Sequence, residues 1–131
     1  MRILIALLLF PALLQAQKVP VKEHFLANGM KVLLVERHDA PSISGGWVAR
    51  VGSVNEPPGI TGIAHLFEHM MFKGTEKYPS GIFSSTVAEI GARDNAFTGR
   101  DFTAYYQLME KSKLETSFKL ESDRMLNLVL S

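Results

Sequence analysis

The chain has 131 residues, of which 47% are hydrophobic, and it carries a formal net charge of +1. This composition excludes a disordered or low-complexity chain. The absence of cysteine excludes a disulfide framework, a thiolate zinc site and a lipid-modified cysteine, so any bound metal must be held by histidine and carboxylate.

Residues 1–16 have the features of a secretory signal peptide. Arg2 is the only charge, residues 3–14 are without charge, and Ala16 offers a small residue for cleavage. A transmembrane helix needs about 20 apolar residues, so we expect export to the periplasm or the exterior without a stable membrane anchor. Without Arg2, 13 basic residues balance 13 acidic ones, and no basic stripe indicates nucleic acid binding.

The exported segment begins with a pattern typical of a β-hairpin. Residues 23–26 and 30–36 are predicted strands, and Asn28-Gly29 between them suits a type I′ turn. Residues 32–35 form a continuous apolar run, so we expect the second strand to be covered on both faces.

A third strand and a helix follow. Residues 43–51 are the strand, and residues 55–59 contain Pro-Pro-Gly, which predicts a loop. Thr61 can cap a helix that continues to about Phe72 and ends near Gly74.

The remaining elements are a second helix, two strands and a last helix. The second helix is expected between Pro79 and Gly91, the strands at 95–98 and 103–108, and the last helix from Leu114 to the end of the chain without a stop signal. The residues expected on inward faces are Phe83, Val87 and Ile90 in the second helix and Leu114, Phe118, Glu121, Met125 and Leu128 in the last. The order of elements predicts an α+β fold for residues 17–131, with a largely antiparallel sheet flanked by helices.

The segment His65-Leu66-Phe67-Glu68-His69 carries the chemistry. Residues four apart lie one turn above each other on a helix, so both imidazoles can bind one metal ion. Glu68 projects near the same face, where a carboxylate can take a proton from the attacking water and pass it to a leaving amine. Neutral imidazoles suit zinc. This order of residues is one of the metallopeptidase signatures.

The alternative is a chance match in an ordinary helix, which occurs about once in a hundred such chains. The context favours a site, because the motif follows a glycine-containing loop on a predicted amphipathic helix. We expect its apolar neighbours to exclude water; they are Ile63, Ala64, Leu66, Phe67, Met70, Met71 and Phe72.

An ordered series of short motifs resembles the pitrilysin/insulinase family of zinc metallopeptidases over residues 23–131. The motifs are Asn28-Gly29, Arg50-Val51-Gly52-Ser53, Glu56-Pro57-Pro58-Gly59, Thr61-Gly62-Ile63-Ala64-His65, Glu68-His69-Met70-Met71-Phe72-Lys73-Gly74-Thr75, Asn95-Ala96-Phe97-Thr98 and Glu121-Ser122-Asp123-Arg124-Met125.

The resemblance implies roles for five residues. His65 and His69 match the family's helical zinc ligands, and Glu68 matches its general base. Asn95 and Ala96 match edge-strand positions that hold the backbone of an extended peptide as an added strand. From the sequence pattern alone, Asn95 is an ordinary strand-end or turn asparagine.

The third zinc ligand that the resemblance implies, a glutamate, falls beyond residue 131, so the zinc-binding domain is expected to be truncated at its C-terminus. A catalytic zinc site needs three protein ligands. Glu121 interrupts an apolar stripe and is the tempting substitute, but we expect it to be a structural carboxylate paired with a neighbour such as Arg124.

The combined expectation is a zinc-dependent endopeptidase that hydrolyses extended peptides or small unfolded proteins outside the cytoplasm. The resemblance also implies a second homologous domain or a partner subunit that completes a closed chamber. The alternatives are an inactive fragment, or a non-catalytic partner subunit of the same fold.

Overall fold

The computed structural model describes residues 19–130, and the chain divides into two compact units after Asp39. The predicted signal peptide, residues 1–16, lies outside the described residues. None of the helices within residues 19–130 is long and apolar enough to cross a membrane.

The first unit is a β-hairpin. Strand β1 (Val21–Phe25) pairs in antiparallel orientation with β2 (Lys31–Val35), as the sequence predicts. The type I′ turn was wrong: Gly29 has a φ of 83°, but Asn28 does not have a positive φ. A hydrogen bond from Leu26 N to Met30 O closes a three-residue loop, in which Gly29 lies in the left-handed region and donates to Leu26 O; such loops are a common alternative for hairpins.

The apolar run in β2 is exposed, contrary to the expectation that both of its faces are covered. The exposed fractions of Leu33, Leu34 and Val35 are 58%, 43% and 44%. Within its own unit the strand has only β1 as a neighbour, and a two-stranded ribbon has no second layer to bury either face.

The second unit contains a three-stranded antiparallel sheet of β3 (Ser42–Ala49), β4 (Arg93–Thr98) and β5 (Thr103–Glu110). The order is β3-β5-β4, so β5 is central and β4 lies at an edge. Alternate residues of β5, among them Tyr105, Gln107 and Met109, are buried on one face. All strand pairs of the described residues are antiparallel, which confirms the predicted α+β class.

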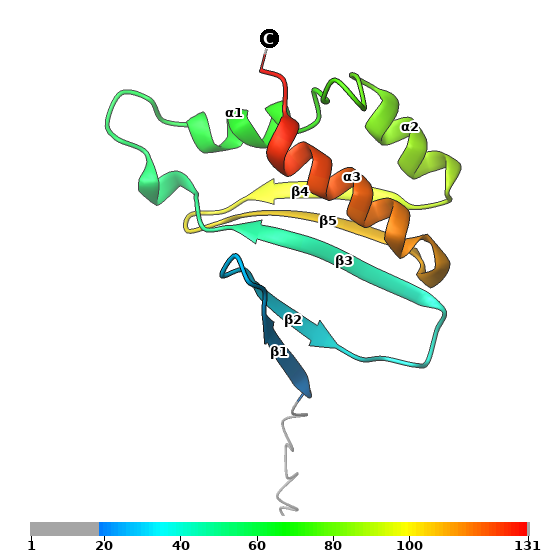
Figure 1. Cartoon of the computed structure of the whole chain (residues 1–131). Coiled ribbons are helices and arrows are strands. Elements are labelled where there is room, and N and C mark those ends of the chain that lie inside the picture. The colour runs from blue at the N-terminus through cyan, green and yellow to red at the C-terminus, as the bar shows by residue number, and fades with distance from the viewer. Residues whose placement is uncertain (1–18, 131) are drawn as a thin grey trace, which may run out of the picture. The chain divides into compact units, whose positions relative to one another are not determined.

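Three helices cover one face of this sheet (Figure 1). They are α1 (Ile63–Met70), α2 (Ile82–Glu89) and α3 (Leu114–Asn127), and short 3₁₀ turns precede α1 (Ser53–Asn55) and α3 (Lys111–Lys113). The core between helices and sheet is formed by Phe83, Val87, Ala92, Met109 and Leu120, with Ile90 packed against it. The inward face predicted for the second helix is therefore confirmed.

Two predictions about helix ends were wrong, and the inward face predicted for the last helix was confirmed for Glu121 but not for Phe118 and Met125. The residue that precedes α1 is Gly62, not Thr61, and it makes no side-chain cap. Helix α3 ends at Asn127, where Leu128 forms a β-bridge with Thr75. Its buried residues are Ser117, Leu120, Glu121 and Arg124, whereas Phe118 and Met125 are exposed.

Candidate metal-binding and catalytic site

Helix α1 places His65 and His69 side by side. The two Nε2 atoms are 3.1 Å apart, and the ring centroids are 4.7 Å apart. Two nitrogens that share a tetrahedral zinc ion at its usual bond length are about 3.3 to 3.4 Å apart, so the pair fits a common metal ion closely. Both imidazoles are exposed, which leaves them accessible to an ion and to further ligands.

Glu56 caps the beginning of this helix. Its two carboxylate oxygens accept hydrogen bonds from Gly62 N at 2.8 Å and Ala64 N at 2.9 Å. These bonds satisfy backbone donors that an α-helix leaves free at its N-terminus. They also stabilise the ionised carboxylate and hold the pKa of Glu56 below its usual value. Glu56 thereby fixes the end of the helix from which His65 projects.

Glu68 lies on the buried side of α1, with 8% of its surface exposed. Its Oε2 accepts a hydrogen bond from the hydroxyl of Thr98, at the end of β4. In the described part of the chain its Oε1 accepts no hydrogen bond. One oxygen of the carboxylate is thus held by the sheet, and the other remains free to take a proton.

A groove of about 550 Å³ lies between α1 and the end of β4. It is lined by Ser53, Glu56, Thr61, Gly62, His65, Glu68, Ala96, Phe97, Thr98, Gly99 and Arg100. Glu68 and one of the two histidines therefore line the same opening. The groove joins the proposed chemical groups to an edge of the sheet.

Ala96 presents its backbone to that edge. Gly99 N donates a hydrogen bond to Phe102 O at 2.7 Å and closes the turn between β4 and β5. Because hydrogen-bonded and non-bonded pairs alternate along antiparallel strands, the N–H and C=O of Ala96 point away from β5. Asn95 Oδ1 accepts from Ala96 N at 2.8 Å. Asn95 itself is exposed and does not line the groove.

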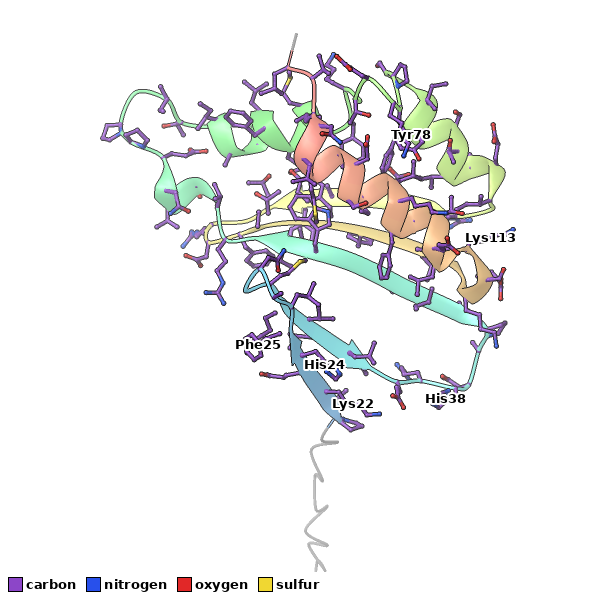
Figure 2. The ribbon with its side chains drawn as sticks, viewed as in Figure 1. Lys22, His24, Phe25, His38, Tyr78 and Lys113 are labelled. Atoms are coloured by element: carbon purple, nitrogen blue, oxygen red, sulfur yellow. The ribbon has the colours of Figure 1, made fainter. Side chains whose placement is uncertain are left out.

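The third metal ligand is not found among the described residues. Within residues 19–130, no set of three His, Cys, Asp or Glu side chains is arranged to hold a metal ion. His24 and His38 belong to the first unit and are exposed (Figure 2). The donors fit zinc in kind and in spacing, and they supply two of the three ligands that a catalytic site needs.

Glu121 takes part in a buried hydrogen-bond network and not in the candidate metal site. Its carboxylate accepts from Trp47 Nε1 at 2.7 Å, from Gln107 Nε2 at 2.6 Å and from Arg124 Nε and Nη2, both at 2.8 Å. The guanidinium lies 4.4 to 5.0 Å from the ring centroids of Phe72, Phe83 and Tyr105. The contacts agree with the structural pairing of Glu121 and Arg124 that was expected from the sequence.

Sequence reasoning missed two residues of the site and misjudged its surroundings. Glu56 and Thr98 both belong to the family motifs of the sequence, but their hydrogen bonds to the start of α1 and to Glu68 were not predicted. An acidic residue shortly before a predicted helix is a usable signal for Glu56, whereas nothing local points from Thr98 to Glu68. Leu66 and Phe67 were expected to exclude water from the site, but they are 58% and 50% exposed.

The fold and the site together define an α+β domain of the metallopeptidase class, in which one helix presents two imidazoles and a carboxylate beside a sheet edge. Residues 31–131 match the family described as insulinase (peptidase family M16). The chain therefore belongs to this family of zinc peptidases.

Relatives and a solved structure agree with this assignment. Insulin-degrading enzyme of Bos taurus is 41% identical over 69% of this chain and 9% of its own length, and an uncharacterized zinc protease of Rickettsia bellii is 33% identical over 82% and 27%. The crystal structure of a protease from Helicobacter pylori matches with a TM-score of 0.83 and 32% identity, over 87% of this chain and 27% of that one. The chain spans less than a third of each of these relatives.

Proposed function

We propose that the protein containing this chain is a zinc-dependent endopeptidase that hydrolyses extended peptides or small unfolded proteins. The observation that carries the proposal is the pair of Nε2 atoms 3.1 Å apart, with a buried carboxylate one residue before His69 on the same helix. His65 and His69 would hold the metal, and the third ligand would come from outside the described residues. When bound, zinc supplies Lewis-acid chemistry that polarises a peptide carbonyl and acidifies water.

Glu68 is the proposed general base. Its Oε2 is engaged by Thr98, so the free Oε1 is the atom that takes the proton from the attacking water and returns it to the leaving amine. General acid–base catalysis of this kind contributes about 10²- to 10⁴-fold to a rate.

The free edge of β4 is the proposed substrate site. A peptide strand laid against it would exchange backbone hydrogen bonds with Ala96 and lie along the groove that holds Glu68. In the structure the N–H of Ala96 donates its hydrogen bond to Asn95 Oδ1. A substrate carbonyl would replace that side-chain oxygen as the acceptor. Asn95 is then free to contact the bound backbone.

The proposal extends to the rest of the protein. Because the chain spans less than a third of the relatives compared, we propose that a second homologous domain or a partner subunit completes the substrate chamber. The relatives include a mitochondrial-processing peptidase subunit beta of Dictyostelium discoideum, whose name describes a subunit. Residues 1–16 support export to the periplasm or the exterior, and an N-terminus at Gln17 in the mature protein would support cleavage after Ala16.

The test compares variants of the complete protein purified from its natural compartment. We expect Glu68→Gln to keep stoichiometric zinc, measured by mass spectrometry of the metal, and to lose peptide hydrolysis by at least about 100-fold. We expect His65→Ala to lose the zinc itself. Glu89→Gln changes an exposed glutamate on α2 and should alter neither quantity. Wild-type protein that carries no zinc, or Glu68→Gln that remains fully active, would refute the assignment.

A further inference from the structure

The carboxylate of Glu68 is held by one side chain from a different element. Thr98 is 30 residues away in the sequence, and its hydroxyl donates to Glu68 Oε2. No other described side chain donates a hydrogen bond to Glu68. A carboxylate with one bonded and one free oxygen has a preferred orientation, because rotation about its terminal bond would break the only hydrogen bond that it makes with residues 19–130.

The neighbouring threonine shows where the hydroxyl protons go. Thr103 pairs with Thr98 across the strands, and its hydroxyl donates to Val51 O at 2.9 Å. The two hydroxyl oxygens are 3.5 Å apart. A hydroxyl has one proton to donate, so the proton of Thr103 goes to Val51 and the proton of Thr98 goes to Glu68. Two threonines that face each other in the sheet therefore have different partners.

Thr98 also shares its strand with the proposed substrate edge. Alternate residues of β4, including Ala96 and Thr98, are partly buried on the face that carries α1. Thr98 is two residues from Ala96, and both line the groove. Strand β4 thus contacts the carboxylate through Thr98 and offers backbone groups through Ala96.

We propose that Thr98 is a positioning residue for the peptidase reaction, whose hydroxyl ties the Glu68 carboxylate to β4 and aims its free oxygen at a peptide bound along the same strand. The inference rests on the proposed function. Its consequence is that the strand that holds the substrate also sets the place of the base. Loss of the hydroxyl should lower the rate of the bound complex and leave substrate and metal binding intact.

The experiment measures kcat and KM for a peptide substrate, together with zinc content, in the complete protein. A hydrogen bond to a charged group stabilises more than one between neutral groups. Its loss in the transition state should therefore lower the kcat of Thr98→Val by at least about tenfold. KM should stay within about twofold and the zinc content unchanged, because neither the backbone of Ala96 nor the imidazoles are altered. Thr98→Ser keeps a hydroxyl and should restore most of kcat.

The matched control is Thr103→Val, which removes a hydroxyl from the facing position but not from the carboxylate. It is expected to lower thermal stability, because Val51 O loses its donor, and to leave kcat near the wild-type value. If Thr98→Val does not fold, Thr98→Ala removes the same hydroxyl with less bulk and takes its place.

Three results would overturn the proposal: an unchanged kcat in Thr98→Val, a Thr98→Ser variant no better than Thr98→Val, or an equal fall in kcat in Thr103→Val. Each is distinct from failure of the proposed function, which would appear as wild-type protein without zinc-dependent hydrolysis.

Discussion

The buried ion pair of Glu121 and Arg124 makes α3 sensitive to loss of a single charge. Only 2% of the surface of Arg124 is exposed, and its guanidinium donates two of the hydrogen bonds that Glu121 accepts. Arg124→Met would leave the carboxylate buried without a cation, which costs about 3 to 5 kcal/mol. The double variant Glu121→Leu/Arg124→Met removes both charges. We expect it to recover about half of that loss, and not all of it, because Trp47 and Gln107 lose their acceptor.

The free energy of unfolding of this region can be measured in the complete protein by urea titration, with hydrogen exchange followed on peptides from β5 and α3. The control is Lys119→Met, which removes an exposed pair with Glu115 on the same helix; exposed pairs contribute little, so the local stability should hardly change. The reasoning is refuted if Arg124→Met costs no more than Lys119→Met. It is also refuted if the double variant is less stable than Arg124→Met alone.

Two further predictions concern the helix cap and the core. The N–H groups of Gly62 and Ala64 lower the pKa of Glu56 from 4.5, so its ionised carboxylate stabilises the fold above that pH, and this contribution disappears as the pH falls through the lowered pKa. Glu56→Gln should therefore unfold at a lower urea concentration than wild type at about pH 7, and this difference should shrink as the pH falls through the lowered pKa; a difference that does not shrink in acid would contradict the cap. Leu120 is 1% exposed at the centre of the core, so Leu120→Ala should cost about 2 to 5 kcal/mol, while Leu126→Ala, at a residue 82% exposed, should cost little in the same titration.

Short-range rules were sufficient to bring the two proposed metal ligands together. Helical periodicity puts residues four apart on one face, and the structure shows His65 and His69 at that spacing with their nitrogens 3.1 Å apart. The same kind of local pattern located the three strands of the sheet in the second unit. These features depend on contacts between residues near each other in the chain, which a pattern can report.

The failures came where a polar residue is buried against a distant partner. The stripe expected on α3 placed Phe118 and Met125 inward together with Glu121, but the helix buries Arg124 and Leu120 beside Glu121 and leaves Phe118 and Met125 exposed. Charged residues are almost never fully buried unless paired, and their partners on β3 and β5 are far away in the sequence. Hydrophobicity alone therefore misplaced Phe118 and Met125, and the contact between Thr98 and Glu68 was unpredictable for the same reason.

Helix α1 has only eight residues, which is too short to be stable on its own in water. Its geometry must therefore come from contacts outside it: Glu56 holds its first turn, Thr98 holds Glu68, and the guanidinium of Arg124 lies 5.0 Å from the ring centroid of Phe72 just beyond its end. Each contact joins the helix to a different part of the second unit. The helix that carries His65 and His69, the proposed zinc ligands, therefore depends on the rest of the second unit for its order. Loss of the Glu56 cap on its first turn should loosen the imidazole pair, although Glu56 makes no hydrogen bond with either ring.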